Sequence, residues 1–317
     1  MTTLEKVAQT LKNGNSIAVF SHIRPDGDTI GCAAGLCQAL RQLGKTAFVL
    51  ENPGTAPLFF PYLDGLTIDS AWTPDTVVAV DMAARSMFPE NAKVYLDRVD
   101  LTIDHHPSQE YFAAQTCLNA SAAACGEILY DIAKQLGPVT SAIATPLYVA
   151  VSTDCGCFVY NNTTPDTHRV AAALMECGID TPLLNKRHFR TKSIRRMQLE
   201  SAMIAGMELY DHDTIAIVCV TAQMLTDIGV TQNDKENLAA LAGELEGIKT
   251  AVTIQEIAPN THKISMRTDP ADLNANTVCG LLGGGGHAAA SGATLQADLA
   301  QTKASVLAAI KQVKYGS

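Results

Sequence analysis

The chain has 317 residues, a net charge of −9, and 47% hydrophobic residues of which few are aromatic. This length suggests about two domains, and an interior of Ala, Val, Leu and Ile is typical of α/β proteins. The acidic charge argues against a partner that wraps long duplex nucleic acid, because such binding neutralises many phosphates. No apolar run approaches a membrane span of about 18 residues, and the N-terminus has no basic-then-apolar signal. We therefore expect a soluble, cytoplasmic protein.

Strands and helices alternate in the first half of the sequence. Apolar runs predict strands at 16–22, 46–50, 76–80, 93–96 and 101–103. Helices are predicted at 29–43, 121–136 and 140–152. This alternation predicts an N-terminal α/β domain with a mostly parallel sheet and helices on both faces.

A basic segment separates this part from the rest of the chain. Residues 186–196 contain six Lys or Arg and no acid. We interpret it as the solvated face of a helical linker, with attraction of phosphate as the alternative. Beyond it, predicted strands at 214–220, 250–257 and 262–267 and predicted helices at 233–246 and 298–312 indicate a smaller C-terminal α/β domain. The predicted division is therefore 1–184, 185–210 and 211–317.

Acidic and imidazole side chains follow four apolar runs. The first run ends in His22-Ile-Arg-Pro-Asp26-Gly-Asp28, and the other three end in Asp81, in Asp104-His105-His106 and in Asp154. We take these runs as strand ends, and open α/β sheets bind ligands at the carboxyl ends of their strands. Taken alone, the first loop would also fit an ordinary turn with a buried histidine. Together, the four segments predict one shared site.

The charge of this set predicts metal ions. Four nearby aspartates repel one another and cannot all stay ionised without compensation, which two divalent cations would provide. Oxygen and imidazole donors without thiolate favour Mn²⁺ or Mg²⁺ over structural zinc. We assign His22 and Asp26 to one ion, Asp28, His105 and Asp154 to the other, and Asp81 as the bridge.

A pair of divalent ions suits displacement at phosphorus, so the set predicts phosphoester hydrolysis. Asp104 is placed to orient His105 or His106 through a ring N–H. His106 would then face the scissile phosphate as a donor or a leaving-group acid. The alternative for His106 is a buried histidine bonded to the backbone.

These four segments resemble motifs I to IV of the DHH phosphoesterase superfamily. The later stretch Gly283-Gly-Gly-Gly286-His287 resembles the C-terminal domain that accompanies one branch of the superfamily. In length and layout the chain is similar to the nanoRNase/pAp phosphatase (bifunctional oligoribonuclease) group. That resemblance implies a Mn²⁺-dependent exonuclease or oligoribonuclease acting on oligonucleotides a few residues long, on 3′-phosphoadenosine 5′-phosphate (pAp), or on both. Mg²⁺ is the second choice of ion.

The resemblance also implies a substrate-binding second domain. Its arginine corresponds to Arg267, its loop histidine to His287, and its phosphate-contacting glycines to Gly284, Gly285 and Gly286. Successive glycine N–H groups can approach an anion closely, and a guanidinium offers a planar fork to phosphate. Without the resemblance, an interdomain turn at His287 and a surface charge at Arg267 would be equally good interpretations.

Two other functions remain open. One is a phosphodiesterase acting on linear or cyclic dinucleotides, which needs the same active-site residues. The other is an inactive module that binds nucleotides or RNA, because the Gly-rich region also resembles a C-terminal region of alanyl-tRNA synthetases. The expected partners are short single strands or small phosphorylated nucleotides, without membrane or long duplex. A homodimer is compatible with the sequence.

Overall fold

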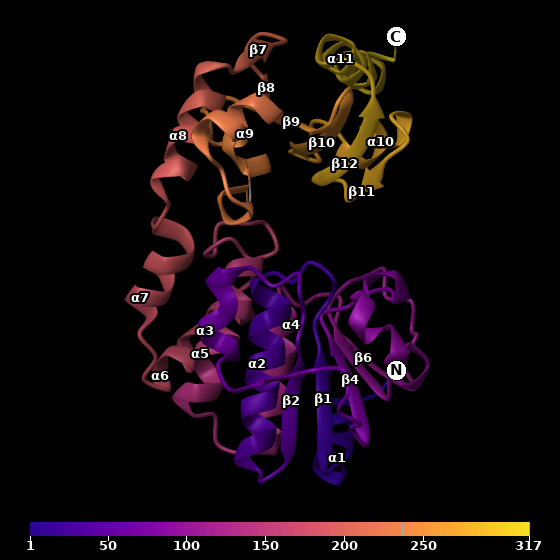
Figure 1. The fold of residues 1–317 in the computed structure, drawn as a ribbon, viewed down its shortest axis with the longest axis vertical. Coiled ribbons are helices and arrows are strands. Elements are labelled where there is room, and N and C mark those ends of the chain that lie inside the picture. Colours follow the sequence, from indigo (N-terminus) through magenta and orange to yellow (C-terminus); the bar gives the residue numbers. More distant parts are fainter. Residues whose placement is uncertain (236–237, 317) are drawn as a thin grey trace. The chain divides into compact units, whose positions relative to one another are not determined.

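The structure is a computed structural model that describes residues 1–235 and 238–316. The chain forms two compact units, Met1–Thr191 (unit 1) and Lys192–Ser317 (unit 2), and Figure 1 labels many of their helices and strands. Each unit contains a six-stranded sheet with helices, so the predicted α/β class is confirmed. None of the helices in the described ranges combines the length and hydrophobicity needed to cross a bilayer.

The sheet of unit 1 is parallel throughout, with the order β3-β2-β1-β4-β5-β6. Its strands are β1 Ser16–Phe20, β2 Thr46–Leu50, β3 Thr67–Ile68, β4 Thr76–Val80, β5 Leu101–Asp104 and β6 Gln115–Leu118. In the register, Phe20 lies opposite Ala79, and Val80 lies opposite Ile103. The carboxyl ends of β1, β4 and β5 therefore lie side by side.

Different kinds of helix cover the two faces of this sheet. The α-helices that contribute to the core on one face include α1 Leu4–Asn13, α2 Gly27–Gln42, α4 Cys125–Leu136 and α5 Ser141–Asp154. The core on the other face includes the buried Ala92 and Tyr95 of the 3₁₀-helix η3, Glu90–Arg98. The strand predicted at 93–96 is therefore wrong. Its Val94 is exposed, whereas Tyr95 points inward and donates its hydroxyl to backbone carbonyls.

The remaining helices complete unit 1. They are the 3₁₀-helices η1 Pro57–Phe59 and η2 Arg85–Met87, the α-helices α3 Phe60–Leu63, α6 Pro165–Glu176 and α7 Thr181–Asn185, and the π-helix η4 Lys186–Arg190. The last of these lies in the basic segment and ends just before the boundary between the units.

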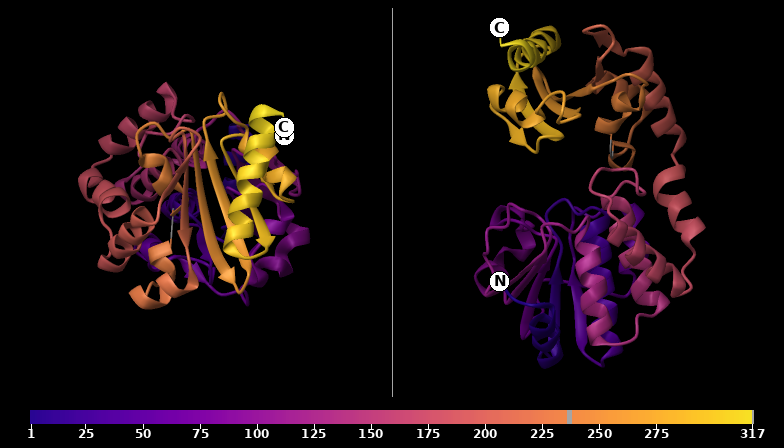
Figure 2. Two further views of the ribbon diagram at one scale, coloured as in Figure 1. Left: turned by 90° about the horizontal axis from the view of Figure 1, so that it is seen from above. Right: turned by 180° about the vertical axis from the view of Figure 1, so that it is seen from behind.

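Unit 2 has a mixed sheet with the order β11-β12-β10-β9-β8-β7. Its strands are β7 Glu208–Tyr210, β8 Ile215–Val220, β9 Thr250–Ala258, β10 Thr261–Thr268, β11 Gly285–Gly286 and β12 Ala290–Gln296. One face packs against α10 Ala275–Leu281 and α11 Leu299–Tyr315, and α11 is seen along the strands in Figure 2. The other face packs against α8 Ile194–Ala205, beside which lies α9 Ala222–Ile228.

The α-helix predicted at 233–246 is wrong where the structure describes it. Residues 236–237 lie outside the described residues, and the 3₁₀-helices η5 Gln232–Lys235 and η6 Leu238–Glu244 lie on either side. Leu238 and Leu241 are buried. Their spacing of three residues suits a helix with three residues per turn.

Candidate metal centre

The predicted residues converge at the carboxyl edge of the parallel sheet of unit 1. His22 lies just past β1, Asp81 directly follows β4, and Asp104 is the last residue of β5. Two aspartates come from helices instead, because Asp28 lies in the first turn of α2 and Asp154 ends α5. The interpretation of the run before Asp154 as a strand end is therefore wrong, whereas the helix predicted at 140–152 is confirmed. The apolar run before Asp154 is a buried helix.

Asp81 lies between two groups of side chains. One carboxylate oxygen, Oδ2, is 3.8 Å from Nε2 of His22, and the other, Oδ1, is 3.5 Å from Nε2 of His105. His22 is also 3.8 Å from the exposed Asp26. The backbone φ of Asp81 is 53°, in the left-handed region, an uncommon conformation that tends to occur at functional sites.

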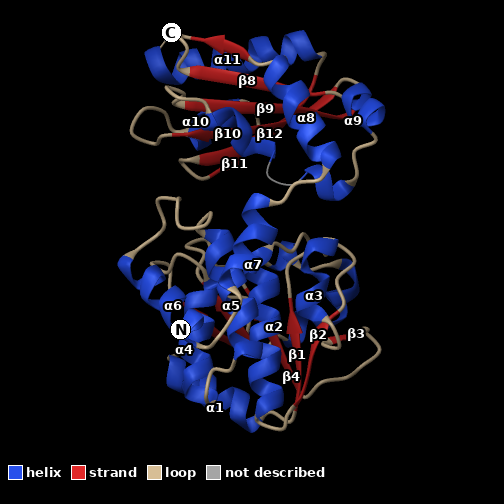
Figure 3. Cartoon of the chain, turned by 90° about the vertical axis from the view of Figure 1, so that its left-hand side faces the viewer, coloured by secondary structure: helices blue, strands red, loops and turns tan. Residues whose placement is uncertain are grey.

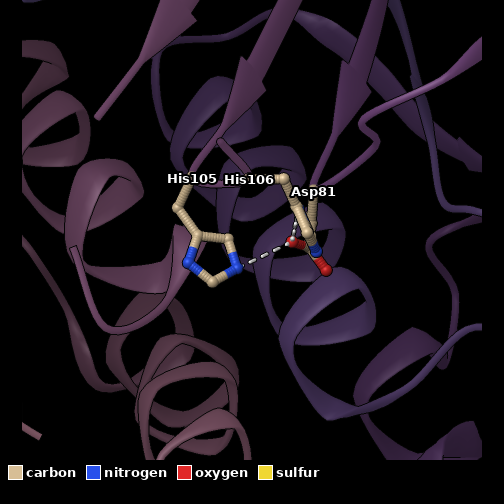
Figure 4. Close-up of side chains that lie close together, drawn as sticks. All are labelled: Asp81, His105 and His106. Carbon is tan, nitrogen blue, oxygen red and sulfur yellow. Dashed lines mark ion pairs between the residues drawn. The ribbon is translucent and has the colours of Figure 1, made fainter. Parts of the chain in front are cut away.

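His105 joins Asp81 to a second group of acids. Its Nε2 lies 3.8 Å from Oδ2 of Asp28 and 3.7 Å from Oδ2 of Asp154. Figure 4 shows the rings of His105 and His106 with their interactions to Asp81. The side chains that we predicted to bind metal ions together with Asp81 therefore lie close to it and to one another.

Backbone and side-chain hydrogen bonds fix the two rings. Nδ1 of His105 lies 3.2 Å from the carbonyl oxygen of Ala122, so a proton on Nδ1 leaves Nε2 free as an acceptor toward the acids. Nδ1 of His106 donates to Oδ1 of Asp104 at 2.7 Å. The other oxygen of Asp104 accepts from the Gln109 amide at 2.6 Å. Asp104 therefore orients His106, and both Gln109 and the Ala122 carbonyl were missed by sequence reasoning.

Helix N-termini hold the acids of motif I. Asp26 caps α2, because its Oδ1 accepts from the backbone N–H groups of Asp28 and Thr29. Asp28 accepts from the N–H groups of Cys125 and Gly126 at the start of α4, at 2.7 and 3.0 Å. Such N–H groups stabilise a carboxylate, so the two acids are fixed before any ligand binds.

The electrostatics of the site favour a bound cation. Burial raises the pKa of Asp28 well above its usual range, and the charges of Asp154 and Asp26 raise it further. Burial and the neighbouring aspartates also raise the pKa of Asp81, and that of Asp154 rises to about 7. Burial and the neighbouring His106 lower the pKa of His105, which favours a neutral ring with an open lone pair.

One observation tests directly whether the residues fit metal ions. Oδ1 of Asp81 is buried and receives no hydrogen bond, which is costly for a carboxylate oxygen. Among the residues that the structure describes, donor atoms within 4.8 Å of one another occur in three sets: His22, Asp26 and Asp81; Asp28, His105 and Asp154; and Asp81, His105 and His106. These oxygen and imidazole donors could hold divalent ions, with Asp81 shared between them.

Three glycines on α2 let the two ligand-bearing helices approach. A Cβ atom at Gly27 would lie 2.2 Å from Oγ1 of Thr153, the residue before Asp154. One turn further on, a Cβ at Gly31 would lie 2.3 Å from the carbonyl oxygen of Pro146, and Gly35 similarly packs on Leu147. This glycine face of α2 brings Asp28 of α2 toward Asp154 of α5.

Gly27→Ala is expected to separate these helix ends. We expect a loss of about 1–3 kcal/mol in the free energy of unfolding, because Thr153 must move, together with weaker Mn²⁺ binding. Denaturant unfolding and isothermal titration with Mn²⁺ measure the two effects. Gly280→Ala is the control, since a Cβ there would meet nothing within 4 Å. Equal effects of the two substitutions would contradict the role given to this face.

The residues predicted to bind substrate lie in unit 2. Gly284–Gly286 run beside β12, where a Cβ at Gly284 would lie 2.1 Å from the Gly292 carbonyl oxygen. His287 follows this loop and is exposed. Arg267 lies near the end of β10, opposite Ala290, whose carbonyl accepts from the His287 N–H. The loop and Arg267 are thus neighbours, joined through Ala290.

Comparisons with known proteins cover both units. The chain matches the DHH family, N-terminal domain, over residues 16–151 and the DHHA1 domain over residues 215–314. It is 32% identical to the bifunctional oligoribonuclease and PAP phosphatase NrnA of Thermus thermophilus, over 96% of this chain and 93% of the relative. The protein of the same name from Bacillus subtilis is 24% identical, over 92% of each chain.

A solved structure extends the likeness to the fold. An exopolyphosphatase-related protein from Bacteroides fragilis superposes with a TM-score of 0.85 at 21% identity, over 98% of this chain and 96% of the other. The chain belongs to the DHH family, and its second unit is a DHHA1 domain.

Proposed function

We propose that this protein is a metal-dependent phosphoesterase that hydrolyses short oligonucleotides to mononucleotides and pAp to AMP. Support comes from the names of its full-length relatives, which specify an oligoribonuclease and PAP phosphatase. We also propose a cytoplasmic location for it. Mn²⁺ is the proposed ion, with Mg²⁺ as the alternative, because the donors are oxygen and imidazole without thiolate.

The observation that carries this proposal is the position of Asp81. Its two oxygens face different histidines, and one of these oxygens is buried without a hydrogen bond. We assign His22 and Asp26 to one ion, Asp28, His105 and Asp154 to the other, and Asp81 to both. When bound, such ions supply charge neutralisation and an activated water for attack on phosphorus.

The chain's own groups orient the ligands and the substrate. The Ala122 carbonyl fixes the ring of His105 so that Nε2 faces the acids. Asp104 holds Nδ1–H of His106, which leaves Nε2 to contact an oxygen of the scissile phosphate or of the leaving group. The side chain of His106 is 29% exposed, so a substrate can reach it.

We assign substrate binding in the second domain to Arg267, His287 and the glycines 284–286. Neighbouring N–H groups of a glycine loop and a guanidinium both suit a phosphate oxygen. In this proposal residues 1–184 form the catalytic domain, 185–210 the connector and 211–317 the substrate-binding domain.

A substrate panel tests the function. The protein is incubated with Mn²⁺ and pAp, the dinucleotide pApA, cyclic di-AMP, a 5-mer RNA or a 24-mer RNA, and initial rates are compared with those in chelator. We expect hydrolysis of pAp, pApA and the 5-mer, little hydrolysis of the 24-mer, and none in chelator. Fastest hydrolysis of cyclic di-AMP would favour a cyclic dinucleotide phosphodiesterase. Absence of hydrolysis for every member would overturn the proposal.

A further inference from the structure

The loop 155–164 joins α5 to α6 and begins directly after Asp154, one of the candidate metal ligands. Figure 3 shows the two helices side by side. Three successive residues at the start of the loop, Gly156, Cys157 and Phe158, have φ angles of 55°, 55° and 68°. The left-handed region is unfavourable for a residue with a side chain, and residues held there tend to occur at functional sites. The shape of this loop is therefore imposed by contacts beyond its own backbone preference.

Phe158 anchors the loop to the helices that it joins. Its ring centroid lies 5.0 Å from that of His168 of α6, with an interplanar angle of 24°, and 6.4 Å from that of Tyr148 of α5. The next two side chains, Val159 and Tyr160, are exposed instead. The loop thus turns one aromatic side chain inward and presents a second one to solvent.

Asn162 fixes the loop to the backbone beside the metal centre. Its amide donates to the carbonyl of Asp154 at 3.2 Å and to that of Ala123 at 2.9 Å. Ala123 directly follows Ala122, whose carbonyl holds the ring of His105. The loop is therefore hydrogen-bonded both to one candidate ligand and to the segment that orients another.

The ring of Tyr160 lies face-on against Gly156. A Cβ atom at Gly156 would be 2.5 Å from Cζ and 2.6 Å from both Cε1 and Cε2 of Tyr160. Approach along the ring plane would bring the hydroxyl oxygen or a single Cε atom closest, so these nearly equal distances require contact with the face. Only glycine leaves room for the ring there. Tyr160 is 53% exposed, so the opposite face of its ring is open to solvent.

The ring is close enough to the metal centre to meet a bound nucleotide. Gly156 comes two residues after Asp154, and two residues of chain span at most about 7 Å. The Gly156 N–H bonds to the Thr153 carbonyl at 3.1 Å, which keeps this turn compact. Tyr160 therefore lies within the length of a single nucleotide from Asp154. In the proposed function the metal ions and unit 2 hold the phosphates of the substrate, and its base has no assigned partner.

We propose that Tyr160 stacks on the base of the nucleotide that carries the scissile phosphate. This inference rests on the proposed function and names the group in unit 1 that selects nucleotides over other phosphoesters. A flat aromatic ring backed by the protein is a rigid platform, and aromatic side chains bind unstacked bases in this way. Every base has a flat face, so the platform tolerates any sequence. That tolerance suits an enzyme that degrades short oligonucleotides to mononucleotides.

A pair of substrates that differ only in the base tests this platform. They are pAp and its base-free analogue, in which hydrogen replaces adenine. Steady-state rates with Mn²⁺ are compared for wild type, Tyr160→Phe, Tyr160→Leu and the control Tyr315→Leu, whose tyrosine is similarly exposed and bonds to Asp211. We expect Tyr160→Leu to raise KM for pAp about tenfold with kcat unchanged. Rates on the base-free analogue should not change, and Tyr160→Phe should match wild type because it keeps the ring.

Two kinetic results would overturn the platform. Equal losses of Tyr160→Leu on both substrates, or a lower kcat, would reveal a displaced loop and a disturbed Asp154. A Tyr160→Phe variant as impaired as Tyr160→Leu would show that the hydroxyl matters and the ring face does not.

Binding separates the platform from the proposed function. Isothermal titration with AMP and with ribose 5-phosphate, both in Mn²⁺, needs no turnover. We expect Tyr160→Leu to weaken binding of AMP about tenfold and to leave that of ribose 5-phosphate unchanged. If wild type hydrolyses neither pAp nor its analogue but shows this difference, the proposed function fails and the platform stands. Equal binding of AMP by wild type and Tyr160→Leu would overturn the platform whatever the activity.

Discussion

Asp81→Asn is expected to lower turnover by at least about 10³-fold, because it removes the charge shared by both proposed ions. The same substitution is expected to stabilise the metal-free protein at neutral pH. Burial and neighbouring aspartates raise the pKa of Asp81, so its charged form is unfavourable in the folded apoprotein. With Mn²⁺ we expect wild type to be the more stable of the two proteins, because it gains binding energy that the variant loses.

Thermal unfolding in chelator and at increasing Mn²⁺, together with initial rates on pApA, measures these effects. The expected stabilisation of the metal-free variant follows from the linkage between proton binding and folding. An aspartate whose pKa is raised in the folded state lowers the free energy of unfolding as pH rises through that pKa, and Asn removes this loss. Asp64→Asn is the control, since Asp64 is exposed. Unchanged turnover in Asp81→Asn would contradict catalysis at this site. Retained nucleotide affinity in chelator, combined with an inactive wild type, would instead support the binding-module alternative.

The clustering of the candidate ligands could be predicted because each member follows a buried apolar run closely. Strand ends of a parallel sheet share one edge, so His22, Asp81 and Asp104 come together although they are far apart in sequence. Asp154 also lies with them, but its apolar run is a helix and not the strand from which its position was inferred. An apolar run of this length does not distinguish a buried strand from a buried helix.

The supporting contacts could not be predicted in the same way. The backbone carbonyl of Ala122 holds the ring of His105. Every residue type has such a carbonyl, so the sequence does not indicate this contact. Gln109 reaches Asp104 across a turn whose shape the sequence does not specify. One signal was present, because Gly27, Gly31 and Gly35 recur every four residues and mark the close contact of α2 with α5.

Short and weakly apolar strands were missed for a related reason. β6 contains only four residues, and β12 consists largely of Ala, Ser, Gly and Thr. Both are held by pairing with a neighbouring strand, β5 and β10 respectively. Tertiary pairing overrides weak local preference in such segments. The strands that were predicted were sufficient to place the site.

His106→Asn is expected to lower kcat for pApA by about 10²–10⁴-fold while leaving Mn²⁺ binding unchanged. The physical reason is that the two neighbouring histidines have different partners. His105 faces three acids, whereas Nδ1 of His106 is held by Asp104 and the His106 side chain remains partly exposed. Asp104→Asn should have a smaller effect, because the amide oxygen can still accept from Nδ1–H. Steady-state kinetics and Mn²⁺ titration measure the effects of both substitutions, with His212→Asn at an exposed histidine as the control.

A loss of Mn²⁺ affinity comparable to that of Asp81→Asn would show that His106 is a metal ligand, as its grouping with Asp81 and His105 also allows. It would contradict the assignment of His106 to the substrate.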